Sequence, residues 1–215
     1  MVGCNNLQKG AAIGAGGGAL LGAVIGKIAG NTAIGAAVGG AVGAGAGAII
    51  GKKMDKAKAE AQAVQNAQVE SVTDANGLQA VKVTFDSGIL FTTGSSTLSS
   101  TAKNSLTQFS NVLKGNADCD VAVQGYTDNA GWKNSTAEQS QQKNLNLSQQ
   151  RAQAVTNYLQ SLGVSSSQIR STTGFGEANP VADNSTAAGK AQNRRVEVYM
   201  YASQKMIQEA EAQAN

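Results

Sequence analysis

The sequence predicts an α+β domain preceded by a hydrophobic helical hairpin. Of the 26 glycines, 16 fall between Gly3 and Gly51, so the first quarter differs in composition from the rest. Beyond residue 69, segments with the two-residue periodicity of strands alternate with segments of helical spacing, which favours one sheet with helices on one face. The predicted divisions are an amino-terminal segment 1–9, a hairpin 10–51, a helical linker 52–68, the α+β domain 69–202 and a carboxy-terminal tail 203–215.

Residues 10–51 have the spacing of a glycine zipper. Glycine recurs at every fourth position from Gly10 to Gly30 and again from Gly35 to Gly51, and Lys27 is the only charged residue among them. In water each Gly destabilises a helix by about 1 kcal/mol relative to Ala. In a bilayer the backbone has to satisfy its own hydrogen bonds, so a helix is favoured, and a stripe of glycines lets two helices approach closely. Each run of about 20 residues is long enough to span a bilayer. We expect a membrane hairpin; the alternative is a Gly/Ala tract without defined packing.

Residues 52–68 are rich in Ala, Lys, Glu and Gln, which predicts a solvated helix that acts as a spacer. Its four lysines follow the zipper directly and form a basic flank for the anionic head groups of membrane lipid. These lysines are Lys52, Lys53, Lys56 and Lys58.

The α+β domain opens with a hairpin. Alternating runs at Val69–Thr73 and Leu78–Phe85 flank Asn76-Gly77, which is a strong turn signal. The segment Gln204–Asn215 has few large apolar residues and predicts a frayed helix. Between hairpin and tail the predicted elements are a helix Ser99–Leu113, a strand Asp120–Gly125, a helix Leu147–Leu162, a strand Ile169–Phe175 and a strand Arg195–Tyr201.

Composition argues against several classes of function. The chain has no histidine and only two cysteines, which removes the commonest general base and leaves no zinc cluster or disulfide framework. Residues 69–215 carry eleven basic and twelve acidic groups, so we expect no nucleic-acid partner. The zipper holds no carboxylate of the kind that an ion-conducting segment needs. We therefore expect no enzyme, no metal and no cofactor, and we expect Cys119 to be a buried free thiol.

Four blocks in a fixed order identify the domain. They follow Phe85–Phe91 and Leu98, and the whole pattern resembles the OmpA C-terminal-like family of peptidoglycan-associated domains over roughly residues 78–202. The resemblance implies the β/α/β/α/β sheet of that family, with helices on one face. The blocks are GYTDNAG at 125–131, NLNLSQQRA at 144–152, GFGEANP at 174–180 and NRRVE at 193–197.

The resemblance also implies a ligand. Asp128 and Arg151 stand where the family holds the diaminopimelate residue of the peptidoglycan stem peptide, and Asn144 stands at a secondary contact. Diaminopimelate presents an ammonium and a carboxylate on one side-chain carbon, so a receptor needs an anion beside a planar fork of donors. The alternative is that Asp128 and Arg151 form an ion pair with a purely structural role.

Further residues of the same motifs are assigned to this site. Thr127 and Leu147 flank the two main residues, and only one of the neighbouring arginines at 194 and 195 can face the site, because adjacent strand residues point to opposite faces. We expect Arg195 to brace it. The segment Trp132–Lys143 is longer than the corresponding loop of the family and predicts a surface excursion. Trp132 is expected to pack against its own loop; the alternative is that it stacks on sugar.

The amino terminus suggests an attachment to a membrane. Val2-Gly3-Cys4-Asn5 resembles the end of a bacterial lipobox, so Cys4 is the expected lipidation site of an envelope lipoprotein whose signal peptide is missing here; the alternative is that Cys4 is a bystander. We expect an outer-membrane location with the α+β domain in the periplasm of a Gram-negative bacterium, where the protein tethers the membrane to the wall. The alternative function is a glycine-zipper homo-oligomer or pore for which the domain is only an anchor.

Overall fold

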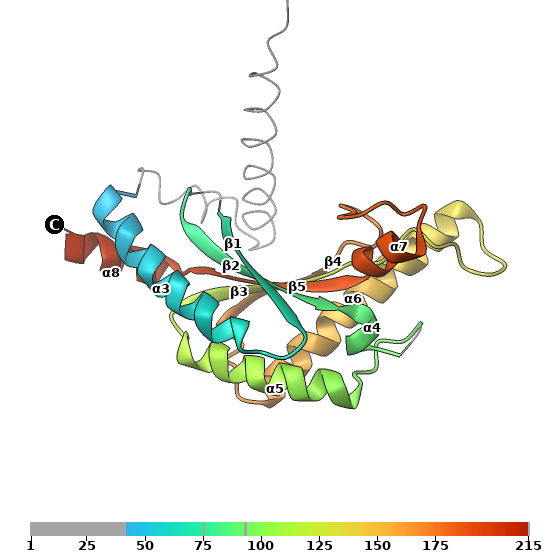
Figure 1. Cartoon of the computed structure of the whole chain (residues 1–215), viewed down its shortest axis with the longest axis horizontal. Coiled ribbons are helices and arrows are strands. Elements are labelled where there is room, and N and C mark those ends of the chain that lie inside the picture. The colour runs from blue at the N-terminus through green and yellow to red at the C-terminus, as the bar shows by residue number, and fades with distance from the viewer. Residues whose placement is uncertain (1–41, 75, 93, 215) are drawn as a thin grey trace, which may run out of the picture.

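The structure is a computed structural model that describes residues 42–74, 76–92 and 94–214. Cys4 and the zipper hairpin up to residue 41 lie outside the described residues. Within the described ranges, no helix is both long enough and apolar enough to cross a membrane. The elements, in chain order (Figure 1), are α3 (Ala44–Gln62), β1 (Ala67–Thr73), β2 (Gln79–Asp86), α4 (Ser87–Leu90), α5 (Ser100–Gly115), β3 (Cys119–Gly125), α6 (Ala137–Ser161), β4 (Ile169–Gly174), α7 (Ala187–Asn193), β5 (Arg195–Ala202) and α8 (Gln204–Ala214).

Five strands form one mixed sheet in the order β1-β2-β5-β3-β4. The first three pairs are antiparallel, and β3 and β4 pair in parallel through the α6 crossover. The β1–β2 hairpin turns where Asn76-Gly77 predicts it: the Asp74 carboxylate accepts the backbone N–H groups of Asn76 and Leu78, at 2.8 and 2.9 Å. The predicted α+β class and all five strands are confirmed.

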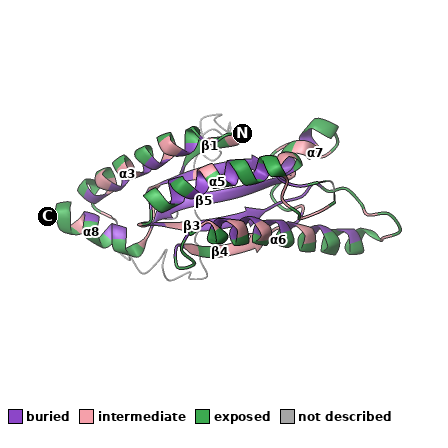
Figure 2. Cartoon of the chain, turned by 90° about the horizontal axis from the view of Figure 1, so that it is seen from below, coloured by how far each residue is buried: buried purple, intermediate pink, exposed green. Residues whose placement is uncertain are grey.

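The main core lies on one face of this sheet, against α3, α5, α6 and α8. The central strand β5 is buried along its whole length (Figure 2). Its residues Val196, Val198 and Met200 join the main core, whereas Tyr199 and Tyr201 lie in a second, smaller cluster with other strand residues. This alternation follows from the two-residue period of a strand.

Helix α3 belongs to the domain, which corrects the prediction of a solvated spacer. It starts at Ala44, inside the range assigned to the zipper, and runs without a break through most of the expected linker. Its apolar residues recur every three or four positions and face β1, β2 and α8, with Ile50 and Met54 fully buried. Lys53 also pairs with Asp118 at 2.6 Å. The spacer interpretation was wrong because the alanines were taken only as a sign of helix formation. In the structure several of them also form part of the buried face of α3.

The carboxy-terminal tail is also ordered against the domain. Helix α8 buries Met206, Ile207 and Ala210, and α3 is its main neighbour. A Cβ added at Gly45 would lie 2.9 Å from the Cβ of Ala214, so the start of α3 touches the end of α8. The expectation of a frayed tail was wrong because three apolar residues at helical spacing suffice when a second helix covers them.

Helix α6 is ten residues longer at its start than predicted. A capping box starts it: the Thr136 hydroxyl accepts the backbone N–H of Gln139, whose side chain accepts the backbone N–H of Thr136. More than half of the expected surface excursion at 132–143 is therefore helix. The sequence analysis also missed the short helices α4 and α7.

Two glycines let α6 lie directly on the ends of β3 and β4. A Cβ at Gly125 would overlap the carbonyl oxygen of Ser148, and a Cβ at Gly174 would overlap the backbone nitrogen of Gln149. Both contacts are with helix backbone, which cannot move aside without lifting the helix. The register of α6 over the sheet is set by these two positions.

We expect Gly125→Ala to destabilise the protein by about 2 kcal/mol or more, because overpacking against backbone forces a shift of α6. The matched control is Gly115→Ala at the end of α5, where the nearest atom to an added Cβ is 4.0 Å away. Urea unfolding followed by circular dichroism measures both. Equal midpoints for the two variants would contradict the close contact.

We expect Ile50→Ala to cost about 2–5 kcal/mol of stability if α3 is part of the core, because a fully buried side chain is removed. Lys52→Ala, on the exposed side of the same helix, is expected to change the unfolding free energy by less than about 0.5 kcal/mol. A small effect for both would show that α3 does not stabilise the domain.

Candidate functional site

Asp128 lies in the loop that follows β3. Its carboxylate is buried, and each oxygen has a partner: Oδ1 accepts the backbone N–H of Ala130 at 3.0 Å, and Oδ2 pairs with Nη1 of Arg194 at 2.5 Å. Of this ion pair, the Arg194 side chain is 39% exposed and the Asp128 side chain only 9%. The anion is therefore fixed in place, and its cationic partner has its outer side in solvent.

Arg151 reaches the same site from α6. It is 5% exposed, its Nε donates to the carbonyl oxygen of Ser95 at 3.0 Å, and its guanidinium carbon lies 5.1 Å from the ring centre of Phe91. Burial is the main cause that lowers the pKa of Arg151; the positive charge of Arg194 lowers it further, and Asp128 opposes both. The three charged groups thus act on one another, and Arg151 remains protonated because its ordinary pKa is so high.

This cluster holds one carboxylate and two guanidinium groups. The η nitrogens of Arg151 have no hydrogen-bond partner among the residues that the structure describes. A planar fork with free donors, close to a buried carboxylate, is suited to a ligand that carries a carboxylate and an ammonium side by side.

Asn144 positions the loop that carries Asp128. Its amide nitrogen donates to the carbonyl oxygens of Ala130 at 3.1 Å and Asp128 at 3.5 Å, and its amide oxygen accepts the indole N–H of Trp132 at 2.7 Å. Trp132 is thus tied to α6 and its own loop, as expected, with the Lys143 ammonium 5.8 Å from the centre of its ring. The amide nitrogen and the amide oxygen of Asn144 thus both have protein partners, which hold the Asp128 loop against α6.

Thr127 and Leu147 complete the predicted set. The backbone N–H of Thr127 donates to the carbonyl oxygen of Gly176 at 2.8 Å, and its buried hydroxyl has no partner in the described part of the chain. Leu147 is half-buried one helical turn before Arg151. The structure therefore brings both to the elements that carry Asp128 and Arg151.

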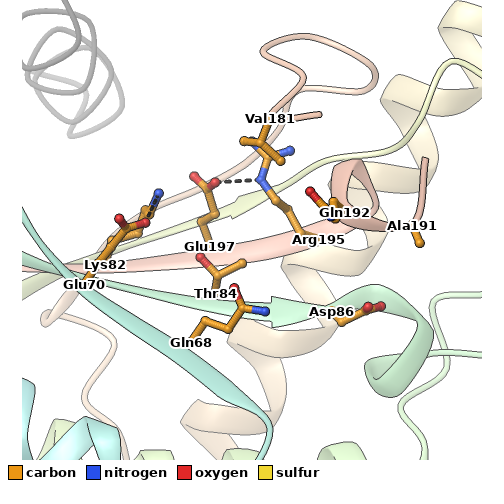
Figure 3. A pocket seen from close by; sticks show the side chains of 10 residues that line it. All are labelled: Gln68, Glu70, Lys82, Thr84, Asp86, Val181, Ala191, Gln192, Arg195 and Glu197. Atoms are coloured by element: carbon orange, nitrogen blue, oxygen red, sulfur yellow. Dashed lines mark hydrogen bonds and ion pairs between the residues drawn. The ribbon is translucent and has the colours of Figure 1, made fainter. Parts of the chain in front are cut away.

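Arg195 lies elsewhere, which corrects the choice between the two neighbouring arginines. Figure 3 shows its side chain directed at Glu197, to which its Nε donates at 2.6 Å, in a pocket of about 390 Å³. Its guanidinium carbon also lies 3.9 Å from the ring centre of Tyr126. Of the two, Arg194 is the one that pairs with Asp128, but strand alternation is not the reason, because Arg194 is the C-cap residue of α7 and β5 begins at Arg195. The expected role therefore passes from Arg195 to Arg194.

Two family models match the chain. The model of the OmpA family matches residues 90–194, and a glycine zipper model matches residues 8–58. The first match includes Asp128, Arg151 and Arg194, and it leaves α3, β1, β2 and α8 outside.

Curated relatives match part of the chain. Residues of this chain are 47% identical over 116 positions to the probable lipoprotein YiaD of Escherichia coli, a match covering 54% of this chain and 46% of YiaD. They are 42% identical over 93 positions to the peptidoglycan-binding protein ArfA of Mycobacterium tuberculosis, covering 43% of this chain and 26% of ArfA. The chain thus spans less than half the length of these relatives.

Solved structures share the fold. A MotB-like protein from Desulfovibrio vulgaris superposes with a TM-score of 0.61 at 19% identity, over 73% of this chain and 96% of that one. The cell wall anchor of the T6SS from Pseudomonas aeruginosa superposes with a TM-score of 0.56 at 27% identity, over 70% and 97%. Together with the four ordered blocks, the family matches show that residues 90–194 form a domain of the OmpA family, preceded by a segment at residues 8–58 that matches a glycine zipper.

Proposed function

We propose that this protein is a non-catalytic anchor that binds peptidoglycan, and that Asp128 and Arg151 hold the diaminopimelate residue of a stem peptide. The observation that carries this proposal is the buried Asp128 carboxylate next to two guanidinium groups, one of which has η nitrogens without a hydrogen-bond partner among the described residues. The names of two relatives support it: ArfA is a peptidoglycan-binding protein, and the Pseudomonas aeruginosa structure is a cell wall anchor.

The ligand and the cluster complement each other in charge. The ammonium of diaminopimelate takes a place on the Asp128 carboxylate, and the carboxylate on the same carbon pairs with the fork of Arg151. Arg194 occupies Oδ2 of Asp128 at 2.5 Å and is half in solvent, so its side chain can turn outward to the ligand carboxylate. When the ligand ammonium replaces Arg194 on Asp128, the buried carboxylate stays paired with a cation throughout. The replacement therefore avoids the free-energy cost of an isolated buried charge.

The placement of the two ends of the domain fits a tether. Helix α3, which continues the zipper region, begins beside α8 at one end of the molecule, and the start of α6 and α7 lie at the other end (Figure 1). Arg194 is the C-cap residue of α7, so its ion pair with Asp128 lies toward the end of the domain opposite the start of α3. We propose that the zipper and a lipid on Cys4 hold the outer membrane, as the name of YiaD, a probable lipoprotein, supports.

We expect Asp128→Asn and Arg151→Lys each to abolish binding of the full chain to sacculi that contain diaminopimelate. We also expect the wild-type protein not to bind sacculi that have lysine at that position. Asparagine loses the charge but keeps an acceptor for Ala130, and lysine keeps the charge but loses the fork. A pull-down measures binding, and thermal midpoints within a few degrees of wild type show that folding is intact. Lys190→Ala is the control for general loss of positive charge. Undiminished binding by both site variants would refute the assignment.

We expect the two arginines to separate binding from stability. Arg194→Gln should weaken wall binding and leave the unfolding free energy within about 1 kcal/mol, because the Arg194 side chain is 39% exposed and the Arg151 charge still acts on the Asp128 carboxylate. Arg195→Gln should cost about 3–5 kcal/mol, because it leaves Glu197 buried without its cation. Urea unfolding and the same pull-down measure both effects; the reverse pattern would restore Arg195 to the site.

A further inference from the structure

A second groove lies beside the Asp128 site and is not used by the proposed grip on diaminopimelate. It has a volume of about 540 Å³ and lies between the first turns of α6 and the loop that follows β4. Its lining residues are Glu138, Gln141, Gln142, Leu145, Phe175, Gly176, Glu177 and Ala178.

The start of α6 presents two different stripes of side chains. Ser140 and Asn144, four residues apart, face the loop that carries Asp128. Glu138, Gln142 and Leu145 line the new groove. The segment that makes α6 longer than predicted therefore forms one wall of the groove. The opposite wall contains Gly176, whose carbonyl oxygen accepts the backbone N–H of Thr127, the residue before Asp128. The two sites share this wall.

The groove contains apolar surface that is available for contact. Leu145 is 40% exposed and is one of only two exposed large hydrophobic residues in the described ranges. Phe175 is half-buried and stacks on Tyr126, with ring centres 5.3 Å apart and planes 15° apart. Since Tyr126 is itself in contact with Arg195, the Phe175 ring has a fixed orientation before any ligand arrives.

The polar groups of the groove are amides and carboxylates. Gln141 and Gln142 offer donors and acceptors, and Glu138 and Glu177 offer acceptors. The pKa of Glu138 is lowered by hydrogen bonds from its own backbone N–H and from Thr136, so it is ionised at neutral pH. No lysine or arginine lines the groove, so it does not suit a phosphate or another anion.

We propose that this groove is a saccharide subsite that takes a hexosamine unit of the peptidoglycan glycan strand. An aromatic and an aliphatic side chain provide surface for the C–H face of a sugar ring and its acetyl methyl, and the amides and carboxylates bind hydroxyl and N-acetyl groups. The stem peptide is covalently joined to the glycan, so a groove that shares a wall with the stem-peptide site is placed for the same ligand. The inference rests on the proposed function.

The experiment compares two probes by isothermal titration with the full chain: a diaminopimelate-containing tetrapeptide stem, and the same stem carrying the N-acetylglucosamine–N-acetylmuramic acid disaccharide. We expect wild type to bind the disaccharide form about tenfold more tightly. The double substitution Leu145→Ala with Glu177→Ala should remove that advantage and leave the affinity for the bare stem unchanged. Gln150→Ala, at an exposed position of α6 outside the groove, should retain it.

The outcomes separate the two proposals. Equal affinity of wild type for the two probes overturns the saccharide subsite and leaves the grip on diaminopimelate intact. No binding of either probe overturns the proposed function and the subsite with it. If a lysine- and leucine-containing peptide binds wild type and the double variant loses it, while the disaccharide gives no advantage, the groove is a site for a cationic peptide and the saccharide inference is wrong.

Discussion

The close approach of α6 to the ends of β3 and β4 is the constraint on which the candidate site depends. Gly125 and Gly174 leave no room for a Cβ, so helix backbone rests directly on strand backbone. This contact sets both the height and the register of the helix. Asn144 and Arg151 then stand at fixed distances from the loop after β3, and the loop carries Asp128 into reach of both arginines. A side chain at either glycine would lift the helix and move one half of the site away from the other.

The electrostatics of the site follow from this rigid placement. Two guanidinium groups close together repel each other, and burial adds to the cost of the Arg151 charge. The Asp128 carboxylate offsets both, but one anion serves two cations. A ligand that brings an ammonium and a carboxylate adds no net charge and supplies the missing anion. The placement of two guanidinium groups around one carboxylate is therefore suited to a zwitterionic ligand.

Much of the domain could be predicted because its signals are local. Alternating apolar residues, the Asn76-Gly77 turn and the order of the four blocks each lie within a short window, and the structure has the expected elements there. What could not be predicted depends on contacts between distant segments. Nothing near Met54 in sequence reveals that β2 and α8 cover that side of α3. The start of β5 at Arg195 depends on the pairing of that residue with Asp86 of β2, which leaves Arg194 outside the strand as the C-cap residue of α7.

The packing of α3 determines how the proposed tether would transmit force. A solvated spacer would let the domain move freely relative to the zipper region, and tension would stretch the spacer first. Here α3 lies against β1, β2 and α8 from its first turn, and it contributes buried core residues such as Ile50. A pull applied before residue 42 therefore acts on the core itself. It has to expose buried apolar surface before it lengthens the chain, so the wall site and the start of α3 move as one body until the core gives way.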